Sequence, residues 1–512
     1  MITREEFQVI YDAGPDAVYA LVCQMQTQID ALTARVRELE ARLNKDSHNS
    51  SKPPSSDGLK KPSVKRPQPR SLRQKTNRSS GAQPGHPGRT LCQVHKPDRV
   101  VPHRPTVCAA CGSSLVPSED APEALQKALE VGCERRQVFD LPPMRLVVTE
   151  HQAIECECPH CHACTKGAFP PGVTEPAQYG PDILALGVYL TQYQLLPFSR
   201  AEQLLSDLFG PSGPVGPSGQ ACQAPCEGTL ASALATCHQK LAPIEAAIKR
   251  AVTQARVGWF DETGIRVRKC LHWLHVASTE TLTYYGHHAK RGRQAFSEIG
   301  VLPHFAGVSV HDALASYHDE SYPCQHALCN AHLLRELTGL WESAHQTWTQ
   351  RMMSLLRLLK HAKDEAKASG RDALDAAVLD RYLQLYRRIV KRGLQQNPRP
   401  EATDKQGKRK RGRPKRGPAR SLLERLQTRE AAILRFAFDF AVPFDNNLAE
   451  RDLRMAKVRM KISGCFRSET GADHFCRIRG YISTLRKQGQ DVLAALRSTF
   501  AGELIWPSLQ PG

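Results

Sequence analysis

The feature that most constrains the fold is a series of β-rich segments joined by short turns, beginning at Val257. Three strand-like runs come first, with the sequences VGWFDETGIRV, LHWLHVAST and TLTYYGHHA. A helical stretch, GRQAFSEIG, leads to FAGVSVHDALASY, a strand that ends at an aspartate. QHALCNAHLLRELTGLW then forms a short strand that runs into a helix. Three strands, a helix, two strands and a helix predict an α/β domain with a mixed sheet.

Three carboxylates fall where such a domain would place a metal site. Asp261 lies in the first strand, Asp312 ends a later strand, and Glu450 lies on a helix that follows DNN. A lone buried charge is costly, so a buried strand rarely carries an aspartate without a partner. Two such aspartates on neighbouring strands repel each other, and Mg²⁺ relieves this with two or three carboxylate ligands. Two metals roughly 3.5–4 Å apart can activate an attacking oxygen and stabilise a leaving one in phosphodiester chemistry.

Two glutamates at or near these positions need not take part in a metal site. Glu262 adjoins Asp261, but side chains alternate along a strand, so Glu262 is expected to point away from the side that Asp261 faces. Glu450 follows Asn447 by three residues, which is the spacing of a capping box, and Asp445 is a second candidate for the helix start. From these residues alone, capping and catalysis are equally good interpretations of Glu450.

The charge balance points to a polyanionic partner. The 512 residues include 70 Lys and Arg against 51 Asp and Glu, a net charge of +19, and nucleic acid is the commonest partner of so basic a chain. No uninterrupted apolar run reaches the ~18 residues that a membrane span needs, so we expect no membrane association. The start, MITREEFQVI, lacks the layout of a signal peptide, so a cytoplasmic location is expected.

The cysteines favour a metal site. The chain has 17 cysteines without an export signal, which favours reduced thiols and metal binding over disulfides. CAAC supplies Cys108 and Cys111, and CPHC supplies Cys158 and Cys161, two pairs at the spacing that grips one tetrahedral Zn²⁺. Cys161 with Cys164 is the competing second pair, and buried free thiols are the alternative to a structural zinc.

The chain divides into five segments. An unbroken heptad pattern predicts a coiled coil over residues 1–45 between two copies of the chain, with a single amphipathic helix packed on its own protein as the alternative. Residues 46–98 are a basic linker expected to be disordered, and residues 99–172 form the Cys-rich zinc-binding module. Residues 173–250 are helical, as either a helix-turn-helix or a plain spacer, and residues 251–512 hold the α/β domain. The heptad positions are Val18, Val22, Met25, Ile29, Leu32, Val36, Leu39 and Leu43.

A very basic loop interrupts the helical segment at residues 340–440. KRKRGRPKR, from Lys408 to Arg416, carries seven positive charges in nine residues. Its RGRP core, with Arg411 and Arg413, resembles an AT-hook, in which an arginine pair enters a narrow minor groove. A solvated basic loop is the alternative.

The order of the motifs is similar to that of bacterial transposases of the insertion sequence 66 family. WFDETG, VHDALASY, CNAHLLREL and FDNNLAERDLR resemble the successive motifs of that family, and CFRSETGA follows the third acid. The N-terminal heptads, NSSKPPSSDG, GAQPGHPG and the CAAC and CPHC pairs resemble it as well. One departure is Ala313, where glycine commonly follows the second aspartate.

The resemblance implies a DDE transposase whose RNase H-like catalytic domain carries a helical insertion. It assigns the catalytic set to Asp261, Asp312 and Glu450, which would hold two Mg²⁺ or Mn²⁺ ions. Cys329 and His332 resemble a Cys-x-x-His motif of such enzymes, with a bracing role. The implied reaction frees a 3′-hydroxyl at an element end and joins it to target DNA.

The expected partners follow from that reaction. They are double-stranded DNA of the element ends and the target, a second copy of the chain, and accessory proteins as further candidates, at the bacterial nucleoid. Basic side chains after Glu450 would hold phosphates near it, against the alternative of a solvated helix face. A catalytically inactive DNA-binding regulator and a nuclease that cuts without joining are the competing functions. The basic residues are Arg451, Arg454, Lys457, Arg459 and Lys461.

Overall fold

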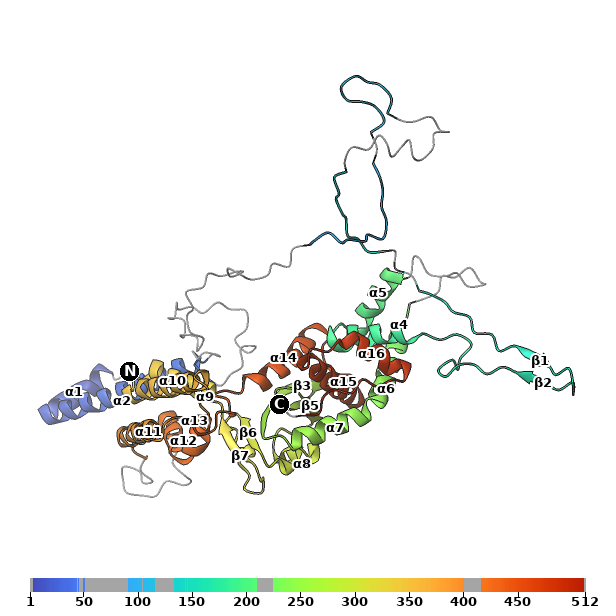
Figure 1. Cartoon of the computed structure of the whole chain (residues 1–512). Helices are drawn as coiled ribbons and strands as arrows, with labels where there is room; N and C mark the ends of the chain where they lie inside the picture. The colour runs from blue at the N-terminus through green and yellow to red at the C-terminus, as the bar shows by residue number, and fades with distance from the viewer. Residues whose placement is uncertain are drawn as a thin grey trace.

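A five-stranded mixed sheet organises the protein (Figure 1). The computed structural model describes residues 3–43, 45, 49–50, 91–103, 105–115, 133–142, 144, 146–209, 224–399 and 416–510. The strand order is β5-β4-β3-β6-β7, with β3, β4 and β5 antiparallel and β6 and β7 parallel to β3. The predicted mixed α/β fold is therefore confirmed. The strands are β3 (Val257–Val267), β4 (Cys270–Ser278), β5 (Thr283–His288), β6 (Val308–His311) and β7 (Gln325–Leu328).

Side chains of the central strand β3 alternate between two cores. Trp259, Ile265 and Val267 pack in one hydrophobic cluster, whereas Phe260 packs in the other. Period-two alternation is what a strand requires when both faces of its sheet are covered. Which face a β3 side chain joins therefore follows from its position in the sequence.

The first face of the sheet is covered by helices from the C-terminal half. α14 packs on β3, α13 packs on β7, and α9 packs on α10. α12 begins with Pro418 at its first position, where the missing N–H has no intrahelical partner to lose. These helices are α9 (Asn330–Ala344), α10 (Thr347–Ala368), α11 (Ala376–Gln396), α12 (Pro418–Thr428), α13 (Glu430–Phe438) and α14 (Asn447–Ile462).

The second face is covered largely by the helices that precede the sheet and by the last two. Ile248 and Val252 of α7 share a core cluster with Phe260, so the packing continues across residue 250. The remaining helical elements described between residues 181 and 501 are α4 (Pro181–Val188), η2 (Tyr189–Tyr193), α5 (Phe198–Phe209), α6 (Glu227–Lys240), α7 (Ala242–Thr253), α8 (Arg293–Ile299), η3 (Leu302–His304), η4 (Ala315–His318), α15 (Glu469–Lys487) and α16 (Val492–Ala501).

Among its described residues, the N-terminal part has two helices and a small hairpin. α1 (Arg4–Asp12) begins with a capping box from Thr3 and Glu6, and α2 (Pro15–Leu43) contains the heptad pattern. The hairpin pairs β1 (Glu155–Glu157) with β2 (Cys164–Lys166) in antiparallel fashion. None of the helices that the structure describes combines the length and the apolar character needed to cross a membrane.

Candidate active site

Asp261 lies on β3, and Asp312 comes directly after the end of the neighbouring parallel strand β6. β3 and β6 pair with Trp259 opposite Val310, so each aspartate follows two residues later on its own chain segment. Trp259 and Val310 both belong to the core under α14. Because side chains two apart along a strand share a face, Asp261 is directed toward the side of the sheet that α14 covers. Asp312 lies in the turn after β6, where its Oδ1 accepts from the Leu314 amide at 2.8 Å.

Glu450 reaches this side of the sheet from α14. Ala449 and Leu453 of that helix are buried in the same core as Trp259. The helix begins at Asn447, with Asn446 as its N-cap residue and no hydrogen bond from the cap side chain. Glu450 is thus the fourth helical residue, and the capping-box interpretation is wrong. Within the described residues, the buried Glu450 Oε1 has no hydrogen-bond partner.

The charges of the other two carboxylates act on Asp261. Burial raises the pKa of Asp261, and the negative charges of Glu262, Asp312 and Glu450 raise it further. A buried carboxylate with other negative charges around it is stabilised by a divalent cation, for which carboxylate oxygens are the natural ligands. The orphaned Glu450 oxygen and the crowded negative charge therefore fit a hard divalent metal.

Glu262 has its own partners on the other side of the sheet. Its carboxylate accepts hydrogen bonds from the Tyr317 hydroxyl at 2.5 Å and from Arg291 Nε at 2.7 Å. Tyr317 belongs to the second core, as the alternation along β3 requires. Burial and the charge of Asp312 raise the pKa of Glu262, and the bonds from Tyr317 and Arg291 oppose that rise.

Cys329 and His332 lie beside Glu450. One ligand atom from each of these three residues falls within 4.8 Å of the others. His332 Nδ1 is 3.7 Å from Glu450 Oε1, and an Arg335 guanidinium nitrogen is 3.9 Å from the same oxygen. Cys329 Sγ accepts a hydrogen bond from the backbone N–H of Asn446 at 3.2 Å. The Cys-x-x-His motif therefore borders the third acid and holds the start of its helix.

Two residues that fix α14 were missed at the sequence level. Asn446 Nδ2 donates to the Phe260 carbonyl at 2.8 Å, which ties the helix start to β3 next to Asp261. Asp452 accepts from Lys487 Nζ at 2.8 Å and from the Ser278 hydroxyl at 2.6 Å. These partners lie far away in sequence, so no local spacing could have signalled the contacts.

Residues 176–474, well over half of the chain, match the sequence model of the transposase IS66 family. The chain belongs to that family. Residues 9–91 match a family of unknown function (DUF6444). No curated protein matches the chain.

Membership in the IS66 family supports a transposase role and implies a DNA-processing enzyme that binds DNA. The matched span begins before α4 and ends within α15, so it includes all five strands of the sheet and all three acids. It also contains the helical segment between β7 and α14.

The basic side chains on α14 of this transposase fall into two groups. Arg451, Arg454 and Lys461 are exposed. Lys457 and Arg459 instead have internal partners: Lys457 donates to the Gly264 carbonyl at 3.0 Å, and Arg459 stacks 3.6 Å from the centre of the Phe466 ring. Their contacts support a packing role for these two residues.

The cysteine pairs of the transposase lie in two similar tight turns. The Gly112 amide donates to the Cys108 carbonyl at 2.9 Å, and the His162 amide donates to the Cys158 carbonyl at the same distance. Hydrogen bonds lower the pKa of Cys111, chiefly from Ser113, and of Cys158, chiefly from the His160 amide. Among the described residues, the four thiols are not gathered into one group.

Two other predicted features of the transposase lie outside the described residues. Arg411 and Arg413 of the AT-hook-like loop belong to residues 400–415, and most of the basic linker belongs to residues 51–90.

Proposed function

We propose that this IS66-family protein is a DDE transposase that cleaves DNA at the ends of its mobile element and joins the freed 3′-hydroxyls to target DNA. The observation that carries the proposal is that the charges of Asp312, which follows β6, and of Glu450 on α14 both act on the buried Asp261 of β3. Three antiparallel strands followed by two parallel ones support an RNase H-like domain.

The three acids are proposed to hold two Mg²⁺ or Mn²⁺ ions. When bound, such ions would activate the attacking oxygen and stabilise the leaving oxygen of the scissile phosphate. The protein contributes position: Asn446 and Asp452 fix α14 against β3 and the sheet, which sets where Glu450 stands relative to Asp261. Chemistry of this kind depends more on positioning and charge neutralisation than on a tuned base.

The exposed basic residues of α14 are proposed to guide DNA to the acids. Arg454 and Lys461 lie four and eleven residues after Glu450, which places them on one stripe of the helix with it. Arg451 is exposed beside them. Cationic side chains along one line can neutralise successive phosphates of a strand. Arg411 and Arg413 are proposed as further contacts in the minor groove.

Two features outside the catalytic domain complete the proposal. The turns at Cys108–Cys111 and Cys158–Cys161 suit the grip of a structural Zn²⁺ by two pairs of thiolates. The exposed heptad positions of α2 suit pairing with a second copy of the chain. Both features would serve recognition of element ends, which a transposase needs and a non-specific nuclease does not.

The experiment is a cleavage-and-joining assay in Mg²⁺ or Mn²⁺, on DNA from the ends of the element that encodes the chain. Asp261→Asn, Asp312→Asn and Glu450→Gln should each abolish cleavage and joining while DNA binding stays intact. Glu280→Gln, an exposed glutamate in the β4–β5 turn, is the matched control and should act as the wild type does.

Three outcomes would contradict the proposal. Normal cleavage by Glu450→Gln would remove Glu450 from the catalytic set. Cleavage without joining by the wild type would favour a nuclease. Binding of the element ends without any cut would favour a DNA-binding regulator.

A further inference from the structure

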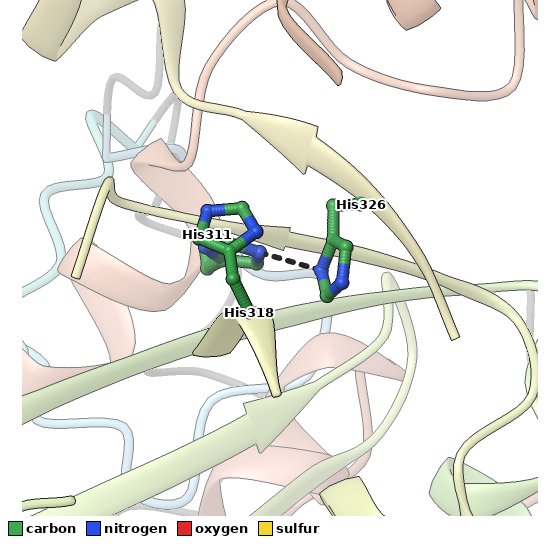
Figure 2. Close-up of side chains that lie close together, drawn as sticks. All are labelled: His311, His318 and His326. Carbon is green, nitrogen blue, oxygen red and sulfur yellow. Dashed lines mark hydrogen bonds between the residues drawn. The ribbon is translucent and has the colours of Figure 1, made fainter. Parts of the chain in front are cut away.

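Three histidines converge on one point (Figure 2). His311 ends β6, His318 ends η4, and His326 lies on β7. One ring nitrogen from each lies within 4.8 Å of the other two. β6 and β7 pair with Ser309 opposite His326, which brings the strands' histidines together, and the turn through η4 returns His318 to them.

The hydrogen bonds of His311 fix which of its nitrogens is free. Its Nδ1 donates to the Asp312 carbonyl, which is an acceptor only, so Nδ1 carries the proton and Nε2 has the lone pair. That Nε2 lies 3.0 Å from His326 Nδ1. Metal-binding histidines typically donate their second nitrogen to a backbone carbonyl in this way, which fixes the tautomer and aims the free nitrogen.

His318 brings a ring nitrogen that no described protein group satisfies. Its Nδ1 is buried and has no hydrogen-bond partner among the described residues. Together with the convergence of the three rings, a buried ring nitrogen that no described protein group occupies is available to a metal ion. Burial also lowers the pKa of His318 to about 4 and lowers the pKa of His326.

We propose that His311, His318 and His326 form a zinc site, with water as the fourth ligand. Three histidines and an open position are a known Zn²⁺ ligand set, in which the metal lies about 2.0–2.1 Å from each nitrogen. Two nitrogens in such a tetrahedron lie roughly 3.3 Å apart, so the 3.0 Å between His311 and His326 needs to open only slightly.

The chemistry of the three histidines and their neighbours favours Zn²⁺ over Mg²⁺. The group contains no carboxylate, and the positive charge of Arg429 acts on all three histidines. A hard cation such as Mg²⁺ depends on anionic oxygens, which this group does not supply. Zn²⁺ gains its affinity from imidazole nitrogens and suits this set.

The zinc would position the proposed catalytic loop. His311 holds the Asp312 carbonyl, and His318 closes the turn that follows Asp312, so the metal would tie that turn to β7. This consequence rests on the proposed role of Asp312, whereas the zinc site itself does not.

The test is the zinc content of the full chain after chelator treatment and reconstitution with Zn²⁺. His318→Gln and His326→Gln should each bind about one zinc per chain less than the wild type. His304→Gln, an exposed histidine in η3, is the matched control and should keep the full content. Equal zinc content in the wild type and His318→Gln would overturn the site.

A second measurement guards against variants that merely fail to fold. In Cys108→Ser/Cys111→Ser, which disrupts the proposed cysteine site, X-ray absorption should show the remaining zinc with imidazole nitrogens and no sulfur. A sulfur-only shell, or no bound zinc, would overturn the proposal. Asp312→Asn should lose cleavage yet keep this zinc, so failure of the catalytic proposal and failure of the zinc site give different results.

Discussion

At the scale of single residues, His275 makes the folding stability of the protein depend on pH in the acidic range. It is buried on β4, its Nδ1 has no partner among the described residues, and its ring meets Phe296 edge-on at 5.6 Å. Burial lowers its pKa to about 4. As pH falls below 6.5, the unfolded chain binds this proton first, so stability falls from pH 6.5 down to about 4 and is unaffected above that window.

His275→Leu should remove this dependence. By pH 5 the wild type should have lost at most about 2 kcal/mol through His275, and the variant should be spared that loss. Thermal unfolding midpoints of both chains at pH 7 and pH 5 check it, with His304→Leu as the exposed control. If the unfolding midpoint fell equally between pH 7 and pH 5 in the wild type and in His275→Leu, the His275 ring would not be the cause of the acid sensitivity.

The candidate site was predictable at this scale only where the signal was local. Asp261 and Asp312 could be predicted because a charged residue inside or at the end of an apolar strand is conspicuous. Asn446 and Asp452 could not, because Phe260, Ser278 and Lys487 become their neighbours only after folding. Capping and catalysis were equal interpretations of Glu450 until the structure placed the helix start at Asn447.

At the scale of elements, Gly307 sets the spacing of β3 and β6. A Cβ at this position would lie 2.3 Å from the Ala255 carbonyl oxygen and 2.5 Å from that of Arg256. Both are backbone atoms just before β3, so no side chain can rotate away. Gly307→Ala should therefore push the two strands apart where they begin and disturb the pairing of β3 with β6, and with it the position of Asp312 relative to Asp261.

Gly307→Ala is expected to destabilise the protein by about 1–3 kcal/mol, as overpacking does, and to reduce cleavage more than DNA binding. Denaturant unfolding and the cleavage assay measure the two effects. Gly228→Ala in α6 is the matched control, since its nearest neighbour would be Cys226 Sγ at 3.7 Å and alanine favours a helix. If Gly307→Ala proved as stable and active as the control, the proposed spacing role would be wrong.

The elements themselves were largely predictable, and their association was not. β-rich runs separated by short turns predicted β3, β4 and β5, and the strand-like run that ends at Asp312 predicted β6. The histidine cluster had no such signal, because His311, His318 and His326 are seven and eight residues apart, which is no recognised ligand spacing. Only the pairing of β6 with β7 and the return through η4 bring them together.

At the scale of the whole molecule, α2 leaves its apolar seam exposed. Leu32 is 66% exposed, and Met25, Ile29, Val36 and Leu39 are exposed as well. The alternative in which this helix packs its seam on its own chain is therefore not what the structure shows. A continuous apolar stripe of this length is costly in water, and a second α2 with the same heptads would cover it.

Ile29→Asp/Leu32→Asp should convert a dimer of the full chain into a monomer, because two buried carboxylates per helix would face each other across the seam. Gln24→Asp/Ala31→Asp puts the same charges on the opposite side of α2 and should leave the dimer intact, which separates seam disruption from a loss of helix propensity. Light scattering at several concentrations gives the mass. A wild type that stays monomeric, or a seam variant as dimeric as the control, would contradict pairing through α2 and would require another partner for the stripe.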